Sequence, residues 1–407
     1  MPDRPRPLPA DLEALSAFSA PGPGVTRLAW TPELRAGYDW FAGRCEEAGM
    51  AVEIDAAGNL VARWEVGEGP ALVVGSHLDT VPSGGRYDGA LGVLGGLEAV
   101  RLLQAWGVTP TRPIWVVGFM DEENARFNTA LFGSRAFCGD DLSDLGDRTD
   151  ADGVTLRDAM AAWDRTPEGT RAAARIGEVG HYLELHIEQG PGLDLAGAQV
   201  GVVTSIVAMT GYRATVTGQA NHAGTTPMGA RRDALSGAAR MVLAIRELGR
   251  ERPHHTTNVG VMSASPGSSN VIPGTASFTI DLRAPDDDAI AALDADCAAR
   301  LRAIAAEEGL ELELERVYAM EAVPMDPQLA DLIASAARDE EASAVAMPSG
   351  AGHDAMVLGR HVPTAMVFVP SRDGISHSPD EFTTAEHCEL GARILARVLM
   401  RLTIPAT

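Results

Sequence analysis

The sequence predicts an α/β protein, with a doubly wound domain around a largely parallel, mixed sheet and a smaller ferredoxin-like domain inserted into it. At 407 residues the chain is longer than one hydrophobic core usually serves, so two domains are expected. Short buried-strand runs alternate with helical patterns over the first half, and this pattern resumes near the end. The stretch between them has the order strand, helix, strand, strand, helix, strand.

The first half of the chain predicts parallel strands joined by helices. Thr31–Gly49 begins with a Thr-Pro-Glu start signal and ends on glycine, as helices do. The apolar runs Ala71–Gly75, Pro113–Phe119 and Tyr182–Ile187 predict buried strands, and Ala90–Gln104 has helical periodicity. Alternation of this kind favours a sheet with helices on both faces.

The middle of the chain predicts the split βαββαβ motif. Its elements in order are Tyr212–Thr217, Gly229–Leu248 (helix), Thr257–Ser263, Thr275–Arg283, Asp286–Glu307 (helix) and Leu310–Val317. Along Thr275–Arg283 every second residue is apolar, which predicts one covered and one open sheet face.

The end of the chain returns to the doubly wound pattern. Pro327–Ala337 and Glu386–Leu402 predict helices, and Thr364–Val369 between them predicts a strand. We therefore predict a catalytic domain from residues 1–209 and 323–407 and an inserted domain from residues 210–322.

The net charge of −23 argues against some classes of partner. An acidic surface repels phosphate backbones and anionic lipid, so we expect neither nucleic-acid nor membrane partners. Met1–Leu12 lacks the apolar core of a secretory signal, and no run approaches the length of a membrane span. The four scattered cysteines are expected to be reduced thiols of a cytoplasmic protein.

His77 follows the first predicted buried strand, where parallel sheets bind their ligands. A histidine in this place is, taken alone, more often structural. Asp79 could orient its imidazole as a carboxylate behind a metal ligand. Asp88 stands among glycines, where backbone can approach a metal closely. Together these residues indicate a metal site.

Acids and histidines also lie at or after the ends of the other predicted strands. They are Asp121, Glu122, Glu123, His186 and His377. Three consecutive acids usually lie in a solvated loop or a first helical turn. At one sheet edge with histidines, however, adjacent glutamates also fit a metal ligand and a general base. Four strand ends with such side chains predict a single site.

The motifs of this chain resemble those of a known family. They are GSHLDTV, YDG, DEEN, LHIEQG, NHAGTTPM, NVIPG, AGHDA and GISHSPDE. They are similar to the N-carbamoyl-L-amino acid hydrolase and allantoate amidohydrolase branch of the M20 metallopeptidase-like amidohydrolases. The resemblance runs from Thr26 to the last helix. Phe127–Phe132 departs from both branches, which bears on side-chain specificity and not on the reaction.

The resemblance implies a binuclear metal site. Asp88 would bridge two divalent ions, Zn²⁺ or Mn²⁺ with Co²⁺ or Ni²⁺ as alternatives, since nitrogen and oxygen ligands do not choose among them. His77 and His186 would complete one metal site, and Glu123 and His377 the other.

The resemblance also implies a reaction at a linear amide or ureido C–N bond. Glu122 would deprotonate a water shared by the metals and return the proton to the leaving nitrogen, and Asp79 would orient His77. No ligand role is predicted for His353, which is expected to orient a loop near the metals.

Substrate recognition would come partly from the inserted domain, which would act as a lid. By resemblance, Arg283 binds a substrate carboxylate with help from Asn270 and His222, while Gln189 lines the pocket. Arg283 would supply positive charge on an acidic protein, in a fork suited to carboxylates. Without the resemblance these residues would be a surface charge, a turn residue and a loop histidine. The family also implies a homodimer through residues 210–322, with His222 and Asn270 entering the neighbouring subunit's site.

The favoured function is hydrolysis of N-carbamoyl-L-amino acids to the free L-amino acid, ammonia and CO₂. Allantoate amidohydrolase and N-acyl amino acid amidase are alternatives. A binding protein on this scaffold that had lost its metals would lack a metal ligand or Glu122. The sequence contains all five predicted ligands and Glu122. A serine hydrolase is disfavoured because the sequence has no Gly-x-Ser-x-Gly elbow.

Overall fold

The computed structural model describes residues 7–403, which divide into two compact units. Unit 1 comprises Met1–Thr204 with Pro324–Thr407, and unit 2 comprises Ser205–Val323. The sequence placed these divisions at 209/210 and 322/323. Residues 1–6, part of the segment assessed for a secretory signal, and residues 404–407 lie outside the described residues. Within residues 7–403, none of the helices is long and apolar enough to cross a membrane.

Unit 1 is built on a mixed sheet with strand order β1-β2-β4-β3-β5-β16-β6-β14, and β15 pairs with β6. The strands are β1 (Ala51–Ile54), β2 (Leu60–Trp64), β3 (Ala71–His77), β4 (Ile114–Phe119), β5 (Val179–Ile187), β6 (Val200–Ile206), β14 (Val323–Pro324), β15 (Ala344–Ser349) and β16 (Thr364–Val369). The neighbours β4, β3, β5 and β16 are parallel. Their carboxyl ends therefore share one edge of the sheet.

Helices cover both faces of this sheet, as predicted. They are α1 (Pro7–Ser16), α2 (Pro32–Glu47), α3 (Ala90–Ala105), α4 (Phe132–Cys138), α5 (Leu156–Ala161), α6 (Gly192–Ala196), α9 (Pro327–Asp339), α10 (Ala355–Leu358) and α11 (Ala385–Thr403). Alternate residues of β3, β4, β5 and β16 join α1, α2, α3 and α11 in one core. On the opposite face, Phe119 of β4 contacts Phe137 of α4 and Tyr182 of β5. The α/β prediction is confirmed.

The two helices that flank β5 approach it at Leu185. A Cβ added to Gly92 of α3 would lie 2.5 Å from the backbone oxygen of Leu185. A Cβ added to Gly391 of α11 would lie 2.5 Å from its Cδ1. Glycine at these positions lets both helices pack close to β5, one residue before His186.

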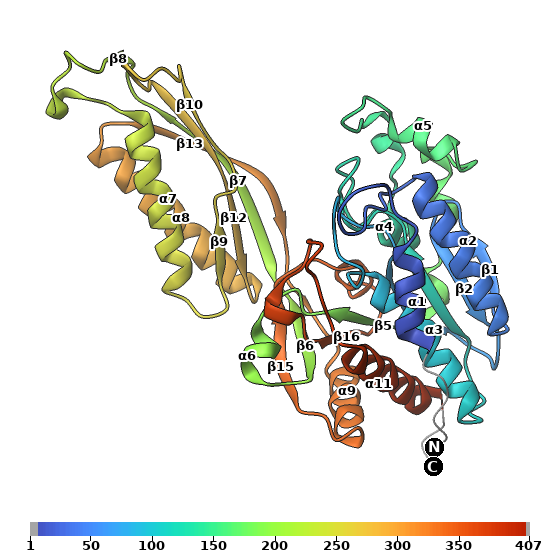
Figure 1. Ribbon diagram of the computed structural model, residues 1–407. Helices are drawn as coiled ribbons and strands as arrows, with labels where there is room; N and C mark the ends of the chain where they lie inside the picture. Colours follow the sequence, from blue (N-terminus) through green and yellow to red (C-terminus); the bar gives the residue numbers. More distant parts are fainter. Residues whose placement is uncertain (1–6, 404–407) are drawn as a thin grey trace. The chain divides into compact units, whose positions relative to one another are not determined.

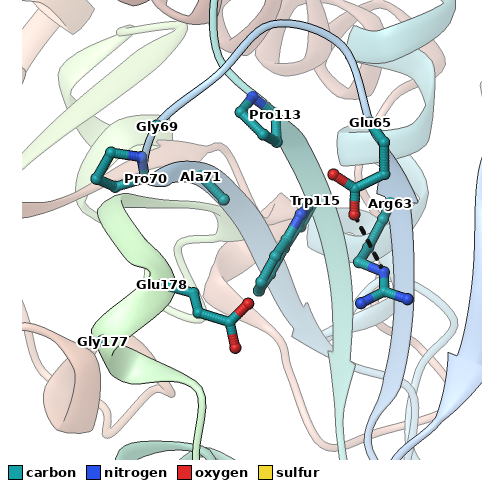
Figure 2. Close-up of a pocket in the computed structure, with 9 residues that line it drawn as sticks. All are labelled: Arg63, Glu65, Gly69, Pro70, Ala71, Pro113, Trp115, Gly177 and Glu178. Carbon is teal, nitrogen blue, oxygen red and sulfur yellow. Dashed lines mark ion pairs between the residues drawn. The ribbon is translucent and has the colours of Figure 1, made fainter.

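A cavity of about 360 Å³ lies at the amino ends of β3 and β4, away from the carboxyl edge of the parallel strands (Figure 2). Its lining residues are Arg63, Glu65, Gly69, Pro70, Ala71, Pro113, Trp115, Gly177 and Glu178. Arg63 and Glu65 pair with each other at 3.3 Å, so the two charges offset one another.

Unit 2 has the ferredoxin-like strand order. Its main elements are β7 (Ala208–Thr217), α7 (Ala234–Arg250), β9 (Thr256–Asn258), β10 (Met262–Ser265), β12 (Thr275–Ala284), α8 (Asp287–Glu307) and β13 (Glu311–Met320). The sheet runs β10-β12-β7-β13, with β9 also paired to β12, and all these pairs are antiparallel. Helices α7 and α8 lie side by side along it and share its core (Figure 1).

Three sequence predictions for unit 2 can be compared with its elements. The alternation along β12 is confirmed, since buried and partly exposed residues alternate over all of Thr275–Ala284. The single strand predicted for Thr257–Ser263 is wrong, because β9 and β10 are separate strands. The helix predicted from Gly229 begins at Ala234, since the side chain of Asp233 accepts the backbone N–H groups of Leu235 and Ser236 and caps it.

Because α3 packs closely against β5, adding a methyl group at Gly92 should destabilise the protein, whereas adding one at an open helical glycine should stabilise it. Gly92→Ala should lower the free energy of unfolding by about 1–3 kcal/mol, because the new Cβ collides with backbone. The control Gly43→Ala, in α2 with open space around its Cβ, should raise it by about 0.5–1 kcal/mol. Urea unfolding followed by circular dichroism measures both. Equal effects of the two changes would contradict this packing.

Candidate metal centre

The parallel strands bring the predicted ligands to one edge of the unit 1 sheet. His77 is the last residue of β3, and His186 is the second-last residue of β5. Glu123 follows β4, and His377 follows β16 after a short turn. Asp88 lies two residues before α3 and completes the set. All five residues therefore belong to unit 1.

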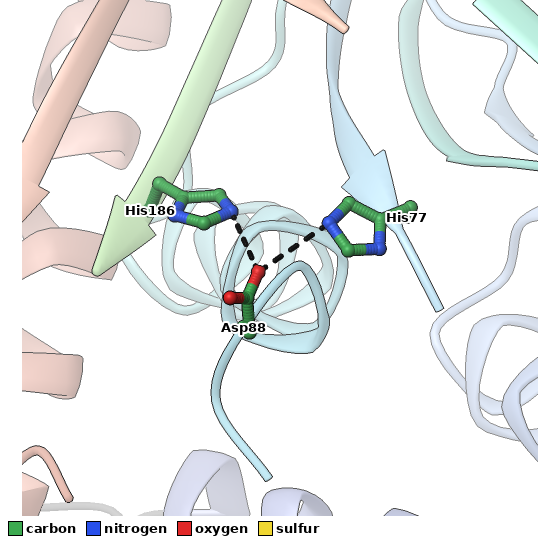
Figure 3. A group of neighbouring side chains, drawn as sticks. All are labelled: His77, Asp88 and His186. Carbon is green, nitrogen blue, oxygen red and sulfur yellow. Dashed lines mark ion pairs between the residues drawn. The ribbon is translucent and has the colours of Figure 1, made fainter. Parts of the chain in front are cut away.

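Asp88 is in contact with three histidines. Its Oδ1 lies 3.5 Å from Nε2 of His77 and 3.3 Å from Nε2 of His186 (Figure 3). Its Oδ2 lies 3.4 Å from Nε2 of His377, and that nitrogen lies 3.3 Å from Oε2 of Glu123. The side chains thus form two groups of possible metal ligands that share Asp88, and these are the two sets that the family resemblance implied.

The residues of this centre suit a divalent cation. Imidazole nitrogens and carboxylate oxygens are the donors that such ions accept. Oε1 of Glu123 is buried and finds no hydrogen-bond partner among the described residues. Burial and the neighbouring charge of Asp88 raise the pKa of Glu123 to about 7. A bound cation would satisfy this oxygen and favour its ionised form.

The three histidines around Asp88 stabilise its negative charge. Burial alone would raise the pKa of Asp88, but hydrogen bonds from the three histidines hold it well below its usual range. The hydrogen bond to Asp88 in turn raises the pKa of His377 to about 9. A metal ion would replace these protons, because histidine binds metals in its neutral form.

The backbone orients two of the histidines. Nδ1 of His77 lies 3.0 Å from the carbonyl oxygen of Asp79, and Nδ1 of His186 lies 2.8 Å from that of Ile187. When Nδ1 donates to a carbonyl, Nε2 is left as the metal-binding atom, and both Nε2 atoms face Asp88.

The carboxylate of Asp79 lies near His77 and also binds backbone N–H groups. It was expected to orient His77, and its Oδ1 lies 3.9 Å from Nδ1, while the backbone carbonyl of Asp79 is closer to this nitrogen. The carboxylate also accepts the backbone N–H groups of Glu122 and Glu123, at 3.4 and 3.2 Å. Asp79 therefore holds the segment that carries these two glutamates.

Glu122 lies beside the two ligand groups. Its Oε2 is 3.8 Å from Nε2 of His77, and only 10% of its side chain is exposed. Burial, with the negative charges of Asp354 and Glu123 close by, raises the pKa of Glu122 well above its usual range. A carboxylate with a raised pKa is better suited to accept a proton near neutral pH.

Glu381 and Ser376 support Asp88, and the sequence analysis did not single them out. Oε1 of Glu381 accepts the backbone N–H groups of Tyr87 and Asp88, at 2.9 and 3.1 Å. The hydroxyl of Ser376 lies 2.9 Å from Oε2 of Glu381 and 2.8 Å from Oδ2 of Asp88. A Cβ at Gly85 would lie 2.0 Å from Oε1 of Glu381, so only glycine leaves room for this carboxylate. Both residues flank His377 within GISHSPDE, and this was the available signal.

Gln189 also contacts Asp88. Its Nε2 donates to Oδ2 of Asp88 at 2.7 Å. Its backbone has a φ of 59°, in the left-handed region, two residues after the end of β5. The predicted pocket residue therefore lies against the carboxylate shared by both ligand groups.

A third group of possible ligands, Glu184, His186 and His353, lies behind the first two. Glu184 is already hydrogen-bonded to the hydroxyls of Ser76 and Tyr182 and to the backbone N–H of Ala355. Nε2 of His353 lies 2.8 Å from the hydroxyl of Ser349. These contacts indicate that Glu184 and His353 hold the loop around His353 in place.

The three predicted substrate residues of the inserted segment belong to unit 2. His222 and Asn270 are exposed and close together, since His222 pairs with Val271 across the short strands β8 (Asn221–His222) and β11 (Val271–Ile272). Arg283 is part of β12 and is paired with Asp281, with Nε 2.9 Å from Oδ1. It is therefore more than an isolated surface charge.

Comparisons with known proteins identify a family and several relatives of this chain. Residues 73–401 match the model of peptidase family M20/M25/M40. The chain is 37% identical to an N-carbamoyl-L-amino-acid amidohydrolase of Paenarthrobacter aurescens, with 96% of each chain covered. It is 35% identical to an allantoate amidohydrolase of Bacillus subtilis, again with 96% of each covered. A crystal structure of a hydantoinase/carbamoylase family amidase from Burkholderia multivorans is 38% identical, with a TM-score of 0.90 and 98% of each chain covered.

The support of Asp88 by Ser376 and Glu381 predicts weaker metal binding when it is removed. Ser376→Ala and Glu381→Gln should each lower the affinity for Mn²⁺ or Zn²⁺ about tenfold, a usual effect of losing a partner behind a ligand. The matched control is Ser378→Ala, because the hydroxyl of Ser378 accepts the backbone N–H of Asp380 and not a bond from the metal ligands within the described residues. Equilibrium dialysis of metal-free protein measures all three. Wild-type affinity in both support variants would contradict the assignment.

Proposed function

The chain belongs to peptidase family M20/M25/M40, and on this premise we propose that it hydrolyses N-carbamoyl-L-amino acids to the free L-amino acid, ammonia and CO₂. One observation carries the proposal. Two groups of ligand atoms share Asp88, and Glu122 lies beside them in a buried position. This arrangement suits hydrolysis of an unreactive C–N bond. The N-carbamoyl substrate class is supported by relatives of that name at 37% and 40% identity.

The chain's own side chains would divide the work as follows. His77 and His186 would hold one divalent ion, Glu123 and His377 a second, and Asp88 both. Two such ions lower the pKa of a shared water and polarise a carbonyl. Glu122 would take the proton from the attacking water and give it to the leaving nitrogen. A ureido carbonyl is a poor electrophile, so both contributions are needed.

The substrate's carboxylate is assigned to Arg283, with Asn270, His222 and Gln189 as further contacts. The exposure of His222 and Asn270 supports a homodimer through unit 2, in which they would reach the neighbouring subunit's site. Closure of unit 2 as a lid would exclude water during the reaction. A cytoplasmic location is proposed on the four cysteines, which are buried and unpaired.

Allantoate is the second candidate substrate, because a relative at 35% identity is an allantoate amidohydrolase. Allantoate also carries a carboxylate and ureido groups. With either substrate, Glu122 would act as the general base and Arg283 would bind the carboxylate.

The substrate class is tested by measuring ammonia and amine release from N-carbamoyl-L-methionine, allantoate and N-acetyl-L-methionine. We expect the highest kcat/KM for N-carbamoyl-L-methionine. Higher kcat/KM for allantoate would move the assignment to the second candidate. Turnover of the N-acetyl compound alone would reject both.

The role of Glu122 is tested by Glu122→Gln. We expect kcat to fall by about 10²–10⁴, the usual contribution of a general base, with metal content unchanged. Glu188→Gln is the matched control, since Glu188 is near His186 in sequence but accepts the N–H groups of Gly192 and Leu193. A Glu122→Gln variant as active as the control would refute the assigned base.

A further inference from the structure

Asp281 links two side chains of unit 2. Its carboxylate takes two contacts from Arg283, with Nε 2.9 Å from Oδ1 and Nη2 3.3 Å from Oδ2. The hydroxyl of Tyr318 donates to the same Oδ2 at 2.5 Å. Arg283, Asp281 and Tyr318 therefore form a connected row of contacts, which we call the Arg283 support.

The sheet register explains how Tyr318 reaches Asp281 across an intervening strand. On β7, Gly211 is the partner of Asp281 on one side and of Tyr318 on the other. A Cβ at Gly211 would lie 2.1 Å from Cε1 of Tyr318, so the tyrosine ring lies directly over this glycine. Any larger residue at position 211 would displace the ring.

A bulge in β13 turns Tyr318 toward this row. The pairing of β13 with β7 shifts between Arg316 and Tyr318, which leaves Val317 as an extra residue. An extra residue in one strand reverses which face the following side chains occupy. Arg316 contacts Tyr212 and Asp294, while Tyr318, two residues later, contacts Asp281.

The contacts fix the plane of the guanidinium group. Two parallel N–H···O contacts hold an arginine more firmly than one, because both edges of the carboxylate are used. The hydroxyl of Tyr318 restrains Oδ2 in turn, and the side chains of Arg283 and Asp281 are only 33% and 27% exposed.

We propose that Asp281, Tyr318 and Gly211 are positioning residues that hold Arg283 in the orientation needed to bind the substrate's carboxylate. This inference rests on the proposed role of Arg283 in substrate binding. Pre-orientation lowers the cost of ordering a long side chain when the ligand arrives. Pre-orientation of Arg283 should therefore strengthen binding of the substrate's carboxylate. It should not change the rate of the hydrolytic step, which takes place at the metal centre.

Kinetics of Tyr318→Phe and Asp281→Asn test the inference, with N-carbamoyl-L-methionine or allantoate as substrate. We expect KM to rise about fivefold for Tyr318→Phe and at least tenfold for Asp281→Asn, with kcat changed less than threefold, as for loss of uniform binding. Glu315→Gln is the matched control. It breaks the pair of Glu315 with Arg213, 3.4 Å apart on the same sheet, and should leave KM unchanged.

A second measurement separates positioning from a purely structural role. In an Arg283→Ala background, Tyr318→Phe should have no further effect on KM, because the two residues act through one group. A Tyr318→Phe effect of the same size in both backgrounds would overturn the inference. So would an unchanged KM in both support variants.

If the proposed function is wrong, the kinetic experiment gives a different result from the one expected if only the inference is wrong. Absence of turnover of both substrates by the wild-type protein would reject that function and leave the kinetic test without a signal. Crystal structures of the wild-type and Tyr318→Phe proteins then decide whether Tyr318 orients Arg283. The inference predicts that Arg283 leaves Asp281 or adopts several rotamers in the variant, and an unchanged Arg283 would overturn it.

Discussion

Asp88 is the carboxylate on which the rest of the metal centre depends. A carboxylate buried this deeply must be compensated by positive charge or by hydrogen bonds. Three histidine nitrogens lie within 3.5 Å of it. Gln189 and Ser376 contact it directly, and Glu381 holds the backbone N–H groups of Tyr87 and Asp88. The same oxygens that attract protonated histidines would attract divalent cations. The need to compensate this one charge therefore explains why so many elements converge at this edge.

The fold meets that need through parallel strands and close helix packing. Because β4, β3, β5 and β16 run in the same direction, side chains that are far apart in sequence leave the sheet at one edge. The glycines of α3 and α11 keep these helices against β5 beside His186. Unit 2 follows a different plan, in which an antiparallel sheet leaves one face open for polar side chains such as Arg283.

Much of this was predictable from the sequence, for physical reasons that also explain the errors. Buried parallel strands are continuous apolar runs, so β3 and β4 and the ligands after them were evident. The strand predicted for Thr257–Ser263 was wrong because both β9 and β10 take their partners from β12, and local composition does not show where pairing breaks. The roles of Glu381 and of the Asp79 carboxylate were missed because both accept backbone N–H groups, which leave no signal in residue type. The contact of Tyr318 with Asp281 depends on a bulge in β13. Strict alternation of side chains along this strand would place Tyr318 on the opposite face of the sheet.

The central claim is that one carboxylate, Asp88, is shared by two metal sites. Crystals of the protein grown with Mn²⁺ or Zn²⁺ and measured by anomalous diffraction test it most directly. The account predicts two peaks, one between Asp88, His77 and His186 and one between Asp88, Glu123 and His377. A single peak, or a peak between Glu184, His186 and His353, would contradict it.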